Sequence, residues 1–298
     1  MNGIAELFPA GPPLDEEQQV GRRPFIDGLD DRMGRGEKTK LLATRRTGKS
    51  SAARAVVRRF KERGEPAASV DLSRLQNSDA VSRSLREQLT PIKALAAPAR
   101  RAGGRLSTLL SKSEGENLES EALKLLAAWL EQGPSSPAGV LEQCAADHTQ
   151  GAIVLDEAHL LAGWDPAEQT ALRAFLRDDR TYGVVIASSE QSALETLVQA
   201  GGPLEDVGTR LTLPQIDPGD WTSELKRRFE ELGAPIDPDA LHLLLEESMA
   251  HPYCTMFLAL ESAVVGEFAG RVTTASVQAA LSVVQADESW ELRHDRLG

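Results

Sequence analysis

Apolar residues follow two alternating patterns over the first two thirds of the chain. Short, mostly apolar runs, which are typical of strands buried in a parallel sheet, occur at residues 40–44, 67–72, 152–157, 182–187 and 210–213. Between these runs apolar residues recur at helical spacing, as in 51–63 and 166–177. This βαβα alternation predicts an α/β fold with a three-layer parallel sheet and right-handed crossovers.

The pattern changes after residue 217. The remaining sequence has helical periodicity and no evident strand, and it predicts amphipathic helices at 221–232, 238–249, 252–268 and 274–286. We therefore expect a small all-helical domain to follow the sheet-containing core. The predicted division is an N-terminal arm over 1–19, a core over 20–214 that contains a basic helical insertion over about 77–140, and a helical lid domain over 215–298.

The N-terminal arm has a different composition from the core. Residues 1–19 are rich in proline, glycine and acidic residues, and we expect them to be poorly ordered unless they dock elsewhere. A short helix is expected to follow and to extend to about Gly34. The insertion is mostly helical, with interruptions at Pro98, Gly103 and Gly115.

The octapeptide Ala43–Ser50, with the sequence ATRRTGKS, fits a phosphate-binding loop in which alanine replaces the first glycine. A strand precedes it and a helix follows it, which is the order that such a loop requires. The alternative is an ordinary strand-to-helix turn. The phosphate-loop interpretation predicts that ATP is bound by the loop amides, that Lys49 supplies positive charge and that Ser50 supplies a hydroxyl for Mg²⁺. The predicted nucleotide-binding residues of the loop are Arg46, Thr47, Gly48, Lys49, Ser50 and Ser51.

A second polar feature is the pair Asp156 and Glu157 at the end of an apolar strand. Ligands of open parallel sheets bind at the carboxyl edge of the strands, so Asp156 is expected to help hold Mg²⁺ and Glu157 to orient a water for attack on phosphate. The alternative is a solvated acidic turn. The tetrapeptide Asp-Glu-Ala-His at 156–159 also occurs in helicases, but no second helicase domain is evident, and His159 is interpreted as a helix-start residue.

Composition restricts the class of protein. The chain has 298 residues, of which 41% are apolar and 26% charged, as in ordinary soluble proteins. Its two cysteines, Cys144 and Cys254, offer no disulfide framework and suit a reducing compartment. No leader-like segment or membrane-length apolar run is evident, and we expect a cytoplasmic protein.

Charge is distributed unevenly around a net value of −12. Residues 83–113 contain seven basic residues and one acidic residue, in contrast to the acidic remainder. This basic segment predicts a patch for nucleic acid, an acidic partner or anionic lipid; the alternative is a solvated insertion. No aromatic residue occurs within it, which disfavours a platform for stacking single-stranded bases.

Several motifs together resemble the archaeal-type ATPases, P-loop ATPases close to the AAA+ and STAND classes. The family's phosphate loop commonly contains Arg-Arg-x-Gly-Lys-Thr/Ser, and residues 45–51 follow that pattern. Further similarities are Val20-Gly21-Arg22, the basic insertion, the serines after the fourth strand, and Ala250-His251-Pro252-Tyr253. The departures are Ala43 for the first glycine, and 250–252 where the family's lid usually has a Gly-x-Pro or Gly-Asn-Pro turn.

The resemblance implies roles for residues that spacing alone does not assign. It places Val20 and Gly21 near adenine, and Ser188 or Ser189 as a polar sensor of the γ-phosphate or attacking water. Both serines are equally suited to cap a helix before Glu190. It makes Arg210 a candidate for stabilising transition-state charge, in its own subunit or a neighbour, with Arg177 and Arg180 as alternatives. The sequence leaves three roles open for Arg45 and Arg46: phosphate contact, pairing with acidic residues of the lid, and solvation.

These observations predict a Mg²⁺-dependent ATPase that acts as a conformational switch, with Lys49, Glu157, Ser188 and Arg210 as its catalytic residues. A protein partner or self-association is expected, and nucleic acid is a further possible partner through the basic segment. The alternatives are a nucleic-acid-associated ATPase, such as a loader or transposition helper, and a nucleotide-binding signalling or defence protein that does not hydrolyse ATP. A small-molecule kinase is disfavoured because no acceptor site is signalled.

Overall fold

The computed structural model describes residues 2–11, 13–75, 77–89, 134–148, 150–199 and 202–294. Its centre is a five-stranded parallel sheet with the order β2-β3-β4-β1-β5. The strands are β1 (Lys38–Leu42), β2 (Ala67–Asp71), β3 (Gly151–Asp156), β4 (Tyr182–Ser188) and β5 (Thr209–Thr212). Each of the five predicted strands is present, with ends that differ by one or two residues from the expected ones.

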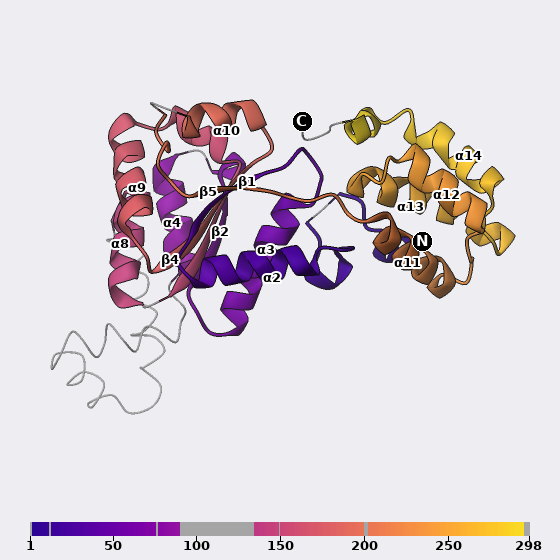
Figure 1. The fold of residues 1–298 in the computed structure, drawn as a ribbon, viewed down its shortest axis with the longest axis horizontal. Helices are drawn as coiled ribbons and strands as arrows, with labels where there is room; N and C mark the ends of the chain where they lie inside the picture. Colours follow the sequence, from indigo (N-terminus) through magenta and orange to yellow (C-terminus); the bar gives the residue numbers. More distant parts are fainter. Residues whose placement is uncertain are drawn as a thin grey trace, which may run out of the picture.

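Helices cover both faces of the sheet, as Figure 1 shows. One face carries α2 (Arg23–Gly34) and α3 (Lys49–Glu62). The other face carries α4 (Ser78–Leu89), α8 (Pro137–Asp147), α9 (Pro166–Asp178) and α10 (Gln191–Val198). Two short 3₁₀ turns, η2 (Leu72–Arg74) and η4 (Ala158–Gly163), follow β2 and β3. The three-layer α/β core predicted from the sequence is confirmed.

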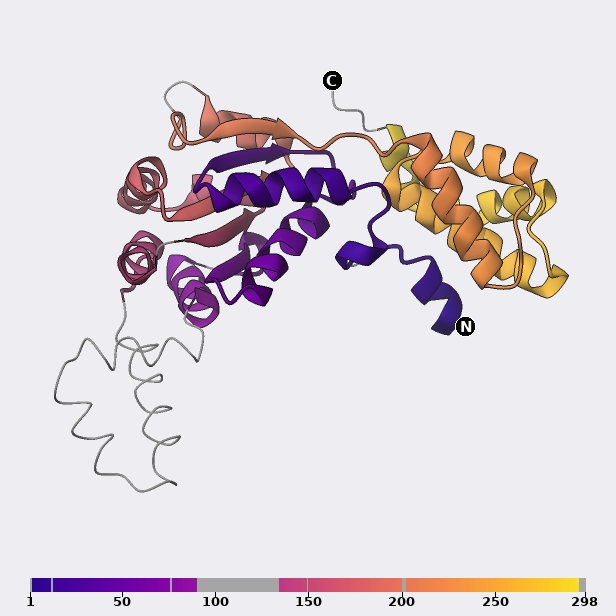
Figure 2. The ribbon, with the colours of Figure 1, turned by 60° about the horizontal axis from the view of Figure 1, so that its bottom comes forward.

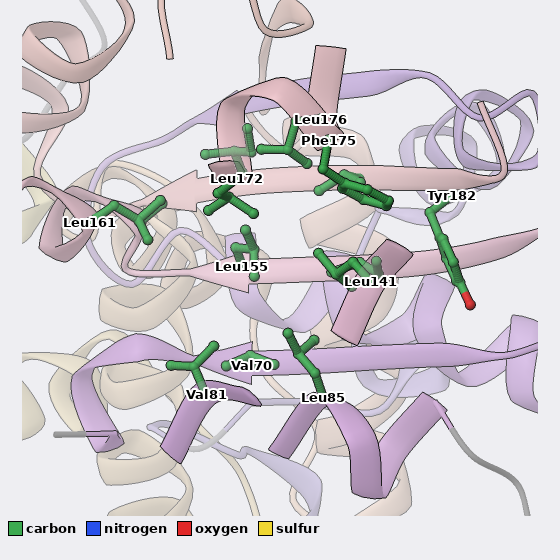
Figure 3. Packing of buried hydrophobic residues seen from close by; sticks show 14 of the residues in the cluster. Val70, Val81, Leu85, Leu141, Leu155, Leu161, Leu172, Phe175, Leu176 and Tyr182 are labelled. Carbon is green, nitrogen blue, oxygen red and sulfur yellow. The ribbon is translucent and has the colours of Figure 1, made fainter. Parts of the chain in front are cut away.

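The side chains of β4 alternate between the two helical layers because successive residues of a strand point to opposite faces. Val184 and Ile186 belong to the core under α4, α8 and α9, whereas Val185 and Ala187 belong to the core under α2 and α3. Figure 3 shows the first of these cores, in which Leu172 and Phe175 of α9 lie over the strands. The fully buried strand runs explain why the strands read as mostly apolar in sequence.

The chain after β5 forms four helices with a separate hydrophobic core. They are α11 (Pro218–Glu231), α12 (Pro238–Glu247), α13 (Pro252–Ala269) and α14 (Thr274–Val284), followed by the 3₁₀ turn η5 (Glu288–His294). Trp221 and Phe229 are buried in this core. In the described chain beyond Thr212, strand-like pairing is limited to one bridge between Ile236 and Val272. The all-helical character expected after residue 217 is therefore observed.

The N-terminal residues dock on the helical part of the protein. A short helix, α1 (Asn2–Leu7), was not expected from the sequence; it contacts α13, and the Phe8 ring lies 4.7 Å from the Phe229 ring, centroid to centroid. Residues 9–20, here called the N-terminal strap, then run past α3 and include the 3₁₀ turn η1 (Glu16–Gln18). Figure 2 shows this segment beside both α3 and the helical part.

Most of the basic segment lies outside the described residues. Residues 83–89 belong to α4, whereas 90–133 are not described, so the prediction of a basic patch over 83–113 remains a prediction. Within the described part of the chain, every helix is too short or too polar to cross a bilayer.

Candidate functional site

A cavity of about 340 Å³ lies at the carboxyl edge of the sheet. Most of its lining comes from the loop between β1 and α3, the N-terminal strap and the start of α13, and other segments add further residues, among them Glu157 and Ile216. The loop contributes every residue from Thr44 to Ser51. The predicted phosphate loop therefore faces an open volume that is large enough for a small polar ligand.

The loop leaves β1 and enters α3 through Gly48, whose φ of 93° lies in the left-handed region. Residues with a Cβ rarely adopt this conformation, which accounts for glycine at this position. The Thr47 hydroxyl donates to the Thr44 carbonyl over 2.8 Å and closes the turn. The first residues of α3, a 14-residue helix, line the cavity, and an anion would be stabilised at this helix N-terminus.

Lys49 lines the cavity yet is only 5% exposed. Burial lowers the pKa of its ammonium group, and the nearby carboxylates of Asp156 and Glu157 oppose that shift without cancelling it. A buried cation without a direct anionic partner is costly, and a bound phosphate would supply that partner. The position of Lys49 therefore favours an anionic ligand.

Ser50 and Asp156 come together from segments 106 residues apart: the Ser50 hydroxyl donates a hydrogen bond to Asp156 Oδ2. Asp156 is 4% exposed, and its other oxygen accepts from the Glu157 amide over 3.1 Å. A hydroxyl and a carboxylate that meet beside a phosphate loop are the oxygen ligands that Mg²⁺ prefers. The donor set thus fits the predicted metal role of these two residues.

Glu157 lines the cavity and is held by Ser189 at the end of β4. Its Oε2 atom accepts from the Ser189 hydroxyl over 2.8 Å and from the Ser189 amide over 3.2 Å. His159 lies 3.4 Å from the same oxygen through Nδ1, which is also 2.9 Å from the Ser188 hydroxyl. The backbone of Glu157 has a φ of 54°, an unfavourable conformation for a residue with a side chain, so the protein fixes this carboxylate at a local cost.

The phosphate loop also contacts the first turn of α13. The Arg46 guanidinium lies 4.1 Å from the centroid of the Tyr253 ring, within range of a cation–π interaction. His251, the N-cap of α13, places Nε2 3.3 Å from the Arg45 carbonyl, while its Nδ1 accepts from the Cys254 amide. These contacts join the loop to the helical part through both side chain and backbone.

Arg22 forms a third connection to the loop. Its guanidinium donates to the Thr47 carbonyl over 3.0 Å and to the Pro214 carbonyl, which belongs to the segment leaving β5. Arg22 is buried, and burial lowers the pKa of its side chain to about 10, so it stays charged at neutral pH. One cation therefore bonds both the phosphate loop and the linker to α11.

The cavity also has an apolar part. Val20 of the strap, Ile216 of the linker, and Trp221 and Met256 of the helical part line it. Gly21 has a φ of 62°, and a Cβ there would lie 2.6 Å from an Asp220 carboxylate oxygen, so only glycine fits beside α11. Val20, predicted to lie near adenine, lines this apolar part, where a flat base could pack, whereas Gly21 does not line the cavity.

Two predicted catalytic residues do not line the cavity. Ser188 is fully buried and bonds His159 and Glu190, whereas the neighbouring Ser189 reaches the cavity. Arg210 lies on the edge strand β5 with its side chain 57% exposed and paired to Glu195 over 2.8 Å. Its alternatives are also remote, since Arg177 pairs with Asp178, and Arg180 bonds the Arg177 carbonyl.

Of the strap, only Val20 was assigned to the site from the sequence, through the family resemblance. Pro9, Leu14 and Gln19 line the cavity although the segment carries no motif. The sequence likewise gave no role to Tyr253, which was only noted as part of a family similarity. The single available signal was the density of proline and glycine in residues 9–21, which predicts irregular backbone but not its location.

Comparison with known proteins shows similarity in fold. No protein-family model and no curated protein sequence matches the chain. A Walker-type ATPase from Pyrococcus abyssi superposes with a TM-score of 0.64 and 17% identity, covering 94% of this chain and 76% of that one. The ORC1 protein of Aeropyrum pernix in complex with DNA has a TM-score of 0.53 and 18% identity, over 95% of this chain and 70% of that one. The RuvB Holliday junction branch migration motor of Thermotoga maritima has a TM-score of 0.51 and 14% identity, over 94% and 74%.

These neighbours share a P-loop core of the AAA+ type. The chain therefore has the fold of the P-loop AAA+ ATPases, as the resemblance in its motifs predicted. At identities of 13–18% the comparison concerns the fold, so residue roles must be argued from this chain.

Proposed function

We propose that this protein is an ATP-binding and ATP-hydrolysing switch. The observation that carries the proposal is the meeting of Lys49, Ser50 and Glu157 at one cavity, with the buried Asp156 hydrogen-bonded to Ser50, from two loops at the carboxyl edge of the sheet. A structural turn or a solvated acidic pair, the two alternatives left by the sequence, would not require a buried lysine to face both acids.

Each residue has a role that follows from its position. Lys49 and the amides of residues 46–51 bind the phosphates, and the Ser51 hydroxyl lies at the start of α3 beside them. Ser50 and Asp156 would hold Mg²⁺. When bound, the metal neutralises phosphate charge and orients the phosphate oxygens.

Glu157 is the candidate for activating water. Its Oε2 is held by Ser189, which leaves Oε1 to accept a proton from a water near the terminal phosphate. Ser189 and His159 act as positioning residues because they fix the carboxylate rather than contact the reacting atoms. In this arrangement Ser189, rather than the predicted Ser188, faces the ligand.

The switch consists of the contacts between the phosphate loop and the helical part. Phosphates that draw the loop inward would alter the Arg46–Tyr253 and His251–Arg45 contacts, and their loss on hydrolysis would reverse the change. The nucleotide state is thereby converted into a difference in the placement of α13 relative to the sheet.

ATP turnover by purified protein, with the Glu157→Gln variant beside it, tests the proposal. We expect turnover to fall about 100-fold or more while ATP affinity is retained, since the amide cannot accept the proton. Glu142→Gln, an exposed change on α8, is the matched control and should turn over at the wild-type rate. Wild-type protein that binds no ATP would overturn the proposal, and binding without turnover would leave the non-hydrolysing switch.

A nucleic-acid-associated ATPase is the second candidate. It is favoured by the basic segment 83–113 and by the presence of a DNA complex among the structures of similar fold. Its test is turnover with and without duplex DNA at two salt concentrations. Stimulation that weakens as salt rises would support this function, because phosphate contacts release counterions. No stimulation at low salt would exclude it.

Self-association would explain the position of Arg210. On an exposed edge strand, this side chain is available to a neighbouring copy rather than to its own cavity. Sedimentation with and without ATP tests this partner, and an ATP-dependent oligomer in which Arg210→Ala lowers turnover would support a role in trans. A monomer with full activity would contradict it.

A further inference from the structure

The cavity lining includes a polar side chain, adjacent in sequence to the apolar Val20, to which the nucleotide roles above give no part. Gln19, in the N-terminal strap, lines the cavity next to Val20. Its Nε2 donates to the Leu14 carbonyl over 3.3 Å, whereas its Oε1 is buried and has no hydrogen-bond donor among the described residues. A buried acceptor left unsatisfied is costly, and a ligand that donates at this point would remove the cost.

The position of Gln19 is fixed by contacts that bind the strap on both sides. Toward the sheet, the Leu14 amide donates to the Ser51 hydroxyl over 3.0 Å, and Arg59 pairs with Glu16. Toward the helical part, Arg228 donates to the Gln18 carbonyl over 3.1 Å. These contacts restrain the segment that carries Gln19 between α3 and the helical part.

These contacts also fix which end of the amide is available. The Leu14 carbonyl is an acceptor and must face Nε2, so the oxygen is the free end. The terminal torsion of glutamine is broad, and a small rotation can turn the oxygen toward a ligand while the donor stays near Leu14. The site thus offers an acceptor, and it would oppose another acceptor placed there.

We propose that Gln19 selects adenine among purine bases by accepting a hydrogen bond from its 6-amino group. Adenine presents a donor at that position and guanine presents a carbonyl acceptor. A ligand that placed the guanine oxygen opposite Gln19 Oε1 would leave two acceptors unpaired, which is the condition under which a polar site discriminates well. This inference rests on the proposed function, because it assumes that a nucleoside triphosphate occupies the cavity.

The test is a cycle that deletes one partner at a time. Full-length wild-type and Gln19→Leu proteins are titrated with a fluorescent ATP analogue labelled on the ribose, and ATP, GTP and the purine riboside triphosphate without a 6-amino group compete against it. We expect the wild type to lose about 3- to 10-fold in affinity when the amino group is absent, and to prefer ATP over GTP by more than that factor. Gln19→Leu should bind ATP and the purine riboside triphosphate equally.

Gln18→Leu is the matched control, since its amide lines the same cavity but its oxygen already accepts from the Asp15 amide. This variant should keep the wild-type sensitivity to the 6-amino group. Loss of sensitivity in both variants would assign the effect to strap shape and overturn the inference. So would a Gln19→Leu protein that keeps the wild-type sensitivity to the 6-amino group. Failure of every nucleotide to compete in the wild type would instead refute the proposed function.

Discussion

The Arg46 guanidinium rests on the Tyr253 ring, 4.1 Å from its centroid. A side chain of the phosphate loop thereby contacts the helical part, although Arg46 also lines the cavity. Its charge extends further along that part: the pKa of Asp287 is lowered chiefly by hydrogen bonds from Ser289, with a smaller contribution from Arg46. Packing of Arg46 on an aromatic ring is not among the three options left open by the sequence, which were phosphate contact, pairing with lid acids and solvation.

The Arg46–Tyr253 contact is measurable by a double-mutant cycle. We expect Arg46→Ala and Tyr253→Ala to show a coupling of about 0.5–1 kcal/mol in the free energy of unfolding, the usual value for an exposed cation–π pair. Urea unfolding of the four proteins measures it. Tyr253→Phe should preserve the coupling because the ring face remains, and Arg45→Ala paired with Tyr253→Ala should show none.

Ser189 is predicted to affect turnover more than binding. Ser189→Ala removes the 2.8 Å hydrogen bond to Glu157 and should lower kcat about 3- to 10-fold with little change in KM, because a positioning contact is lost. Ser189→Thr retains the hydroxyl and should restore most of the rate. A faster Ser189→Ala enzyme would mean that the bond restrains Glu157 rather than aligns it.

Arg228 is predicted to hold the strap in place. Its guanidinium bonds the carbonyls of Leu7 and Gln18 and also pairs with Glu224 over 2.7 Å, so Arg228→Ala should cost about 2–4 kcal/mol of unfolding free energy. Limited proteolysis should then cut within residues 9–19. The adjacent Arg227→Ala serves as control. It removes only exposed ion pairs and should cost less than about 1 kcal/mol without exposing the strap.

Lys49 gives a pH dependence of defined sign. Because burial lowers its pKa in the folded protein, the unfolded chain holds this proton more tightly, and the stability of wild type relative to Lys49→Met should rise with pH between the lowered and the ordinary values. Unfolding of both proteins from neutral pH to pH about 10 measures the difference. ATP affinity should fall over the same range, since phosphate binds the ammonium form. A stability difference that does not change with pH would show that burial does not lower the pKa of Lys49.

Parts of the site that are contiguous in sequence could be predicted. Ser50 was identified from the phosphate-loop motif between a strand and a helix, and Glu157 because it stands directly after a buried strand, at the edge to which parallel strands bring their carboxyl ends. The central strands β3 and β4 were predictable because they are buried throughout and consist mostly of apolar residues.

The parts that depend on packing could not be predicted. Gln19 reaches the cavity only because Arg228 and Ser51, distant in sequence, bond the strap. Arg210 was predicted from its place at the start of a strand, but that strand is the sheet edge beyond β1, which directs the side chain to Glu195. Which of Ser188 and Ser189 faces the cavity depends on the alternation of side chains at the end of β4, and the sequence alone did not determine it.

The two hydrogen bonds of Arg22 link movement of the phosphate loop to movement of the linker that precedes α11. Its planar guanidinium bonds the Thr47 and Pro214 carbonyls at the same time, and the fork has no internal rotation that would let one bond shift without the other. A displacement of the loop must therefore pull the linker or break a charge-assisted bond. Because Arg22 is buried, water cannot readily replace either of these hydrogen bonds, and the loop and the linker are expected to move together.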